Sequence, residues 1–347
     1  MARTLFGRSE KKLNEAALRV KSFNIAVLSK DKPLHNRLLA GIIDELATKT
    51  IISPLVTLVP GELAWNETYE AARILVKKKP DAIVTVGALC SQAMRYVLNE
   101  EKLDIPLFFG GVDRPDFLGL VPSLASAYRS TGINDGQPLH IASAHILSFI
   151  KPSMRHVLIP YSVSFDDGGL TNAAALAKRY FESKNIKATV IPLCPDEMAI
   201  DRLAPFLGMV DTVMCFEGCS TQTYQDELIT RCNNLGVTIF AGDISMVQAG
   251  AAIGFVLDHG LIGRALATYI YKALWLNVPL TSLPIRSLGC SARRLAINEA
   301  SAGAQGIVFD EVLLHMLKNG RVYGKVSLGD AGVVTGLDIP KKEADDL

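Results

Sequence analysis

The chain has 347 residues, of which 49% are hydrophobic and 20% charged, and its formal net charge is +1. This length exceeds what one hydrophobic core usually serves, so we expect two domains of ordinary globular composition. The nearly neutral charge gives no reason to expect a nucleic acid or an anionic membrane as a partner. The longest apolar candidate for a membrane-spanning helix, residues 249–276, is interrupted by Asp258, His259 and Arg264.

The N-terminal region is polar and basic and lacks the apolar core of a secretory signal. Two interpretations stay open: a cytoplasmic protein that starts at Met1, or a mature or engineered form from which a signal was removed. We expect residues 1–21 and 327–347 to be flexible or peripheral ends.

The first half of the chain alternates apolar, β-prone runs with segments of helical spacing. FNIAVLSK from Phe23, PDAIVTV from Pro80 and IPLFFGG from Ile105 have the composition of buried strands. Residues 36–48 and 90–98 place apolar side chains at helical spacing between them.

The second half repeats this plan. RHVLIPYS from Arg155 resembles the Phe23 run, and VTIFAGD from Val237 resembles the Ile105 run, each displaced by 132 residues. The run after Asp211 follows the similar run after Asp81 by 130 residues. Residues 170–183 and 221–233 supply the intervening helices.

Strands alternating with helices predict right-handed βαβ units and parallel sheets. We therefore expect an α/β fold of two doubly wound, Rossmann-like lobes with a hinge and an interlobe cleft. The expected N-terminal lobe is 22–135 plus 250–285, including a long helix over 261–276. The expected C-terminal lobe is 136–249 plus 286–326. Ligands of such sheets bind beyond the carboxyl ends of the strands, where glycines and small polar residues gather in both halves.

The order of these segments from Phe23 to Ile307 resembles the ABC-transporter substrate-binding proteins of the tryptophan/tyrosine-type family, which have the type I periplasmic-binding-protein fold. The stretches that carry the resemblance are KKKPDAIVTVGALCSQA, IPLFFGGVDRPDFLGLV, STGIND, IKPSMRHVLIPYS and LAINEASAGAQGI. The chain departs from the family pattern at four strand ends. Ala88 stands where the family has Thr, and the segment 112–115 is one residue longer than in the family. The family has other residues at the positions of Tyr161-Ser162 and Glu217-Gly218. These positions contact the ligand in the family, so the resemblance implies the fold more firmly than the ligand.

The resemblance implies a receptor that closes on a small polar metabolite and delivers it to an ABC permease. An amino acid, aromatic ones included, is the leading ligand. It further implies a monomer without a cofactor, located in the periplasm or otherwise outside the cytoplasm if a signal was removed.

An amino acid presents a carboxylate, an ammonium group and a side chain, and each needs a different partner. Hydroxyls and backbone N–H groups suit the carboxylate, a carboxylate suits the ammonium group, and an aromatic ring suits an apolar side chain. The candidate ligand-binding residues are Ala88, Ser91, Asp113, Thr131, Gly132, Tyr161, Ser162, Glu217, Gly218, Asp243 and Ser245. Structural roles stay open for several of them: Asp113 as a turn residue, Asp243 and Ser245 as a helix cap, and Tyr161 as a core residue.

Two other function classes are weighed against this one. An enzyme is not expected, because no recognisable catalytic or metal-binding motif occurs, although Cys90 lies near a predicted helix N-terminus that would lower its pKa. The spacing of Cys215 and Cys219 lacks the second pair that a zinc site needs. A cytoplasmic ligand sensor with the same clamp is the alternative, which six cysteines without a disulfide framework favour.

Overall fold

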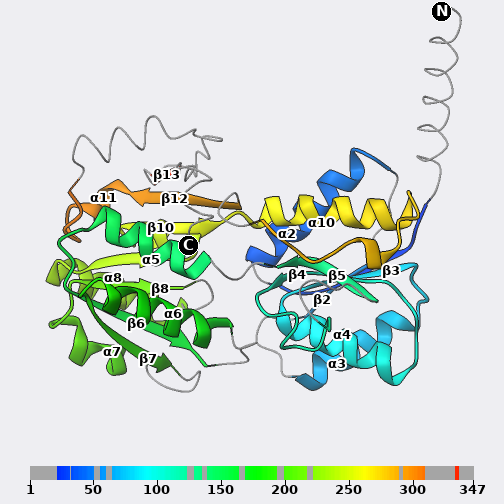
Figure 1. Cartoon of the computed structure of the whole chain (residues 1–347), viewed down its shortest axis with the longest axis horizontal. Helices are drawn as coiled ribbons and strands as arrows, with labels where there is room; N and C mark the ends of the chain where they lie inside the picture. Colours follow the sequence, from blue (N-terminus) through cyan, green and yellow to red (C-terminus); the bar gives the residue numbers. More distant parts are fainter. Residues whose placement is uncertain are drawn as a thin grey trace, which may run out of the picture. The chain divides into compact units, whose positions relative to one another are not determined.

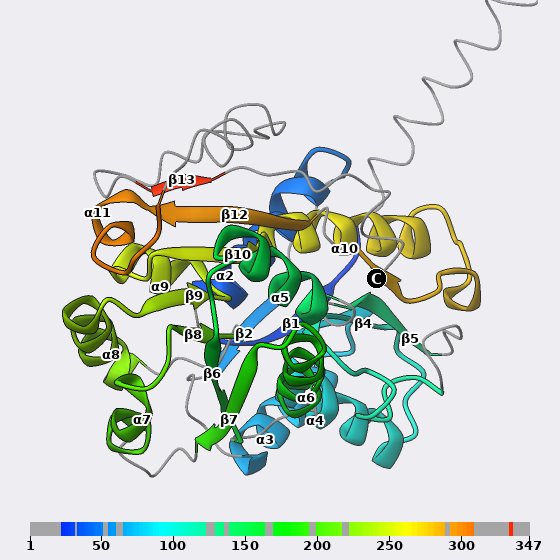
Figure 2. The same ribbon diagram turned by 60° about the vertical axis from the view of Figure 1, so that its left-hand side comes forward.

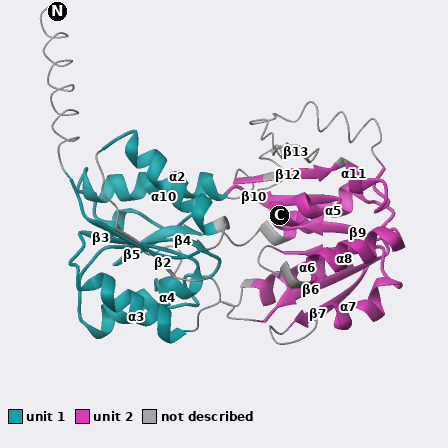
Figure 3. Cartoon of the chain, turned by 180° about the vertical axis from the view of Figure 1, so that it is seen from behind, with its two compact units in different colours: residues 1–135, 259–288 teal, residues 136–258, 289–347 magenta. Residues whose placement is uncertain are grey.

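The computed structural model describes residues 22–31, 33–50, 55–59, 65–122, 129–134, 139–163, 169–193, 199–216, 222–288, 292–308 and 333–335. The chain divides into unit 1, residues 1–135 and 259–288, and unit 2, residues 136–258 and 289–347 (Figures 1 and 3). None of the helices in the described parts is long and apolar enough to cross a membrane.

Unit 1 is a sheet with helices on both faces, and its described strands are all parallel. In the described residues its strands run in the order β11-β5-β4-β3-β1-β2. Helices α2 and α10 pack against each other on one face, and α3 and α4 pack against each other on the opposite face (Figure 3). The bounds are β1 Ile25–Lys30, α2 Pro33–Ala47, β2 Leu55–Val59, α3 Trp65–Val76, β3 Ala82–Val86, α4 Ala88–Glu100, β4 Leu107–Val112, β5 Ser130–Asn134, α10 His259–Leu274 and β11 Arg286–Ser287.

Unit 2 has the same winding. Its described strands run in the order β13-β12-β10-β9-β8-β6-β7. Helices α5 and α6 pack together, and α8 contacts both α7 and α9 (Figure 2). The bounds are α5 Leu139–Ile150, β6 His156–Ser162, α6 Gly169–Ser183, β7 Lys187–Leu193, α7 Ala199–Leu207, β8 Thr212–Cys215, α8 Gln222–Leu235, β9 Thr238–Ala241, α9 Ile244–Ala249, β10 Ile253–Leu257, β12 Arg293–Asn298, α11 Glu299–Ala302 and β13 Val333–Thr335.

The two sheets confirm the internal repeat and the doubly wound α/β class. The order β5-β4-β3-β1-β2 in unit 1 matches β10-β9-β8-β6-β7 in unit 2, and the neighbouring strands in both series are parallel. The helix after the fifth strand lies in the other unit in both cases: α5 follows β5 but belongs to unit 2, and α10 follows β10 but belongs to unit 1.

The structural division differs from the expected lobe boundaries at two places. Residues 250–258 lie in unit 2 rather than with the N-terminal lobe, because β10 pairs with β9 and β12. Residues 286–288 lie in unit 1, because β11 pairs with β5. Residues 1–21 lie outside the described residues, whereas 333–335 of the expected peripheral tail pair with β12 as β13.

The aspartate that recurs in both halves holds the amino-terminal edge of each sheet. The Asp81 carboxylate accepts a hydrogen bond from the backbone N–H of Asn24 at 2.7 Å. The Asp211 carboxylate accepts from the N–H groups of Arg155 and His156 at 2.7 and 2.9 Å. The repeated residue therefore ties the third strand of each series to the first, at the edge opposite the carboxyl ends.

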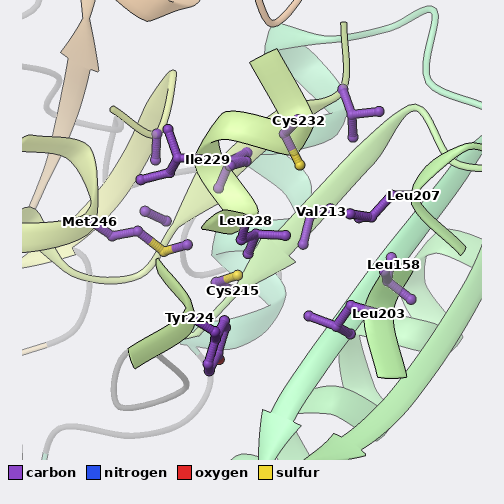
Figure 4. Packing of buried hydrophobic residues seen from close by; sticks show 14 of the residues in the cluster. Leu158, Leu203, Leu207, Val213, Cys215, Tyr224, Leu228, Ile229, Cys232 and Met246 are labelled. Atoms are coloured by element: carbon purple, nitrogen blue, oxygen red, sulfur yellow. The ribbon is translucent and has the colours of Figure 1, made fainter. Parts of the chain in front are cut away.

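Two apolar clusters cover the faces of the unit 2 sheet. One lies under α7, α8 and α9 and includes Leu203, Val213 and Leu228 (Figure 4). The other lies under α5 and α6 and includes Phe181, Phe240 and Phe255. Alternate residues of each strand enter alternate clusters, as the pleat of a sheet with two covered faces requires.

Candidate ligand-binding site

The carboxyl ends of the parallel strands define one edge of each sheet, and six of the predicted residues lie at such ends. Ala88 and Asp113 follow β3 and β4 in unit 1. Tyr161 and Ser162 end β6 in unit 2, and Asp243 and Ser245 follow β9. The unit 1 residues follow strands of one sheet, and the unit 2 residues lie at the ends of strands of the other. Doubly wound folds bind ligands beyond such carboxyl ends.

The unit 1 residues are half-buried and come from adjacent strands. Ala88 is the first residue of α4, directly after β3. Asp113 directly follows β4, and its backbone carbonyl accepts a hydrogen bond from Asn134 Nδ2 at 3.1 Å. In the same loop, Arg114 binds Asp116 through Nε at 3.1 Å and Nη2 at 3.0 Å, and these hydrogen bonds lower the pKa of the Asp116 carboxyl. The longer segment after β4 is thus held by its own charge pair.

Three predicted residues of unit 1 have structural contacts that occupy them. The buried Ser91 hydroxyl donates to the Gly87 carbonyl at 2.8 Å and lies 2.9 Å from Thr85 Oγ1. The buried Thr131 hydroxyl donates to the Leu283 carbonyl at 2.5 Å. At Gly132, a Cβ atom would overlap the backbone oxygen of Phe109. These contacts give Ser91, Thr131 and Gly132 structural roles inside α4 and β5.

In unit 2, Tyr161 and Ser162 are half-buried at the end of β6. Tyr161 also packs against the cluster under α5 and α6, so its ring is held in place from one side. A rigid aromatic ring at a strand end is suited to contact an apolar group. The predicted residues Glu217 and Gly218 lie outside the described residues.

Asp243 is the N-cap of α9. Its Oδ1 accepts from the Met246 N–H at 3.0 Å and from the Ser245 hydroxyl at 2.5 Å, and the residue is 5% exposed. The cap explains the aspartate by itself, because an N-cap carboxylate satisfies otherwise unpaired helix N–H groups. Ser245 is exposed. The capping role identified as an alternative in the sequence is the one that the contacts show.

Sequence reasoning missed one polar residue at this edge of unit 1. Asn134, 7% exposed, ends β5 and donates to the Asp113 carbonyl. Its place in the stretch STGIND, where the chain leaves β5, is a signal by which it could have been identified. Asn134 links the loop after β4 to the end of β5.

The environment of Cys90 does not favour a reactive thiolate. Burial raises the pKa of its thiol to about 12, and the nearby Lys30 offsets only part of that rise. The thiol is therefore protonated at neutral pH, whereas a reactive cysteine needs a thiolate. The helix position of Cys90 does not outweigh its burial. Among the described residues, no group of three or more His, Cys, Asp or Glu side chains is placed to hold a metal ion.

The buried thiols predict a loss of stability at alkaline pH. Burial also raises the pKa of Cys232 to about 12 (Figure 4). An unfolded thiol titrates near about 8.5, so the contribution is fully present below that pH and is lost as the pH rises toward 12. Full titration would cost at most roughly 5 kcal/mol per thiol. Between about pH 8 and about pH 10.5 an unfolded thiol ionises while a buried native thiol stays protonated. We therefore expect the free energy of unfolding to fall more steeply over this range in the wild type than in Cys90→Ala or Cys232→Ala. Parallel curves from urea titrations would contradict this.

A family model described as "ABC transporter substrate binding protein" matches residues 25–319. Three solved structures are similar along most of both chains. A domain in complex with L-Trp from Streptococcus pneumonia has a TM-score of 0.69 at 19% identity, covering 84% of this chain and 98% of that one. A conserved domain protein from Vibrio cholerae has a TM-score of 0.70 at 20% identity, covering 85% and 98%. A ligand-free, open substrate-binding protein with adhesive properties from Clostridium difficile has a TM-score of 0.66 at 15% identity, covering 83% and 96%. A search of curated protein sequences finds no match.

Proposed function

Because the chain belongs to the family of ABC transporter substrate-binding proteins and has the type I periplasmic-binding-protein fold, we propose that it is the ligand receptor of an ABC importer. The observation that carries this proposal is the family match, which spans the repeated strands of both units. On this proposal, loops at the carboxyl edges of both sheets contact one small ligand, and ligand binding favours a closed arrangement.

An amino acid is the ligand class that the strand-end residues suit best. Asp113 and Asp243 offer carboxylates to an ammonium group, and Tyr161 offers a ring to an apolar side chain. Ser162 offers a hydroxyl to a carboxylate. Ala88 and Ser245 line the starts of the helices that follow β3 and β9, and Glu217 and Gly218 stay in the proposed set. The relative from Streptococcus pneumonia, which was solved with L-Trp, supports including aromatic amino acids.

The proposed partner is an ABC permease, with the receptor acting as a monomer outside the cytoplasmic membrane. The alternative is a ligand sensor with the same fold in a reducing compartment, which the buried free thiols of Cys90 and Cys232 favour. Cell fractionation of the native gene product separates the two: a periplasmic or surface-exposed protein supports the importer, and a cytoplasmic one supports the sensor.

A thermal-shift screen of ligand-stripped protein tests the proposal. The panel contains the amino acids and related small metabolites. A ligand present at about 100 times its dissociation constant should add about 2.7 kcal/mol to the free energy of unfolding, which raises the melting temperature measurably. A selective shift by one compound class supports a receptor, whereas no shift with any compound contradicts it.

Two variants at one position separate the capping role of Asp243 from a ligand contact. Asp243→Asn keeps a side-chain acceptor for the Met246 N–H but removes the charge. Asp243→Ala removes both and should lower the free energy of unfolding by about 1 kcal/mol. We expect Asp243→Asn to keep its stability and to weaken amino acid binding in titration calorimetry. Unchanged affinity in Asp243→Asn would mean that Asp243 caps α9 and does not contact the ligand.

A further inference from the structure

A buried arginine lies at the carboxyl edge of the unit 2 sheet. Arg293 is the first residue of β12, which runs antiparallel to β10, and its register partner is Leu257, the last residue of β10. Because β10 is parallel to β9, the end of β10 points to the same edge as the ends of β6 and β9. Arg293 thus reaches the candidate ligand edge from the amino end of its own strand.

The contacts of Arg293 position its guanidinium group without neutralising it. The residue is 6% exposed. Its Nη1 donates to the Phe255 carbonyl at 3.1 Å, and its guanidinium carbon lies 5.9 Å from the centroid of the Phe255 ring. Phe255 lies one residue beyond Gly254, the register partner of the last residue of β9. The guanidinium group is therefore held beside the end of β9.

The guanidinium group has unused hydrogen-bonding capacity. Its Nε is buried and has no hydrogen-bond partner, and among the described residues Arg293 forms no ion pair with a carboxylate. A guanidinium group stays charged at any physiological pH, and an unpaired charge is costly to bury. A buried donor without a protein acceptor calls for an explanation, and a role in binding an anionic ligand provides one.

We propose that Arg293 binds the carboxylate of the transported ligand, which makes the substrate class a small carboxylate-bearing molecule. This inference rests on the proposed receptor function. The chemistry fits because a guanidinium group presents N–H donors in a planar fork that matches the two oxygens of a carboxylate. Phe255 fixes the orientation of the fork through its carbonyl and its ring, leaving Nε to a ligand oxygen.

Matched acids and amides test the proposal directly. The probes are L-tryptophan with L-tryptophanamide, L-leucine with L-leucinamide, and benzoate with benzamide, each titrated by calorimetry and by thermal shift. We expect an acid to bind the wild type and its amide to bind at least about 100-fold more weakly, the range seen when one partner of a buried charge pair is lost. Arg293→Met should weaken binding of the acid by a similar factor. Arg293→Lys, which keeps the charge but not the fork, should show an intermediate loss.

Arg231→Met is the matched control, because Arg231 makes an exposed ion pair with Glu227 on α8. Its affinity should equal that of the wild type. If an acid binds Arg293→Met as tightly as the wild type, or if acid and amide bind equally, Arg293 is not a ligand contact and the receptor function stands. If no acid binds the wild type while another compound of the thermal-shift panel does, the inference fails and the receptor function stands. Should Arg293→Met not fold, Arg293→Lys and the acid–amide comparison on the wild type decide.

Discussion

Replacing Gln305 by leucine should destabilise unit 2 more than any other single change considered for that unit. The Gln305 side chain is fully buried. Its Oε1 accepts from the Ile239 and Ala252 N–H groups at 2.8 and 3.0 Å. Its Nε2 donates to Asn233 Oδ1 at 2.8 Å and to the Gly250 carbonyl at 2.7 Å. One amide therefore joins β9 to the residues that flank β10 and to the ends of α8 and α9.

Leucine has a similar volume but leaves these partners buried without hydrogen bonds. Each unsatisfied buried group costs about 1–3 kcal/mol, so we expect a loss of roughly 4 kcal/mol in the free energy of unfolding. Both tryptophans of the chain, Trp65 and Trp275, lie in unit 1, so tryptophan fluorescence does not report on unit 2. Amide hydrogen exchange at Ile239 and Ala252 does, and protection at both should fall sharply.

The matched control is Gln248→Leu, the same change at an exposed position of α9. It should shift the free energy of unfolding by less than about 0.5 kcal/mol. Equal exchange rates in the Gln305→Leu and Gln248→Leu variants would mean that the buried amide is not what joins these elements.

Gly263→Ala should have the largest effect in unit 1. Helices α2 and α10 approach so closely that a Cβ atom at Gly263 would overlap the Leu38 backbone oxygen and lie 3.0 Å from the Ile42 nitrogen. A Cβ atom at Gly41 would likewise overlap the Gly260 carbonyl. The atoms in the way belong to the backbone, so no rotamer change relieves the overlap and the helices must move apart.

We expect Gly263→Ala to lower the free energy of unfolding by about 2 kcal/mol, since overpacking against backbone atoms costs up to about 3 kcal/mol and outweighs the gain of about 1 kcal/mol in helix propensity. Trp275 is the probe: it is 1% exposed at the end of α10 and stacks on Tyr271 at 5.8 Å between ring centroids. The negative control is Gly208→Ala in unit 2, where a Cβ atom would meet nothing within 4 Å, so the Trp275 signal should match that of the wild type. A Gly263→Ala variant as stable as Gly208→Ala would show that the two helices separate at no cost.

The strand-end positions of the candidate site could be predicted, but the state of each side chain could not. Ala88, Asp113 and Ser162 lie at strand ends, because an apolar run that stops at small or polar residues marks where a buried strand leaves the sheet. Ser91 and Thr131 are likewise small and polar, yet their hydroxyls form hydrogen bonds inside unit 1. The acceptor of Thr131 is Leu283, 152 residues away in the sequence, and no local pattern reports such a partner.

Arg293 was missed for a related reason. In the sequence it begins an apolar run, which suggests the amino-terminal edge of a sheet, where binding is not expected. Only the antiparallel pairing of β12 with β10 brings it to the carboxyl edge. The direction of a strand is a property of its neighbours and is not encoded in its own residues.

The repeated βαβ plan, the main helices and the resemblance to the receptor family could be read from the sequence. The predicted helices 36–48, 90–98 and 170–183 correspond to α2, α4 and α6, because the apolar periodicity of a covered helix is a local signal. Three features required the folded structure: the unit that holds 250–258, the partners of Asp81 and Asp211, and the polar side chains whose hydrogen bonds lie within the protein. Each of these depends on contacts between residues far apart in the chain, and burial and hydrogen bonding arise only when those residues meet.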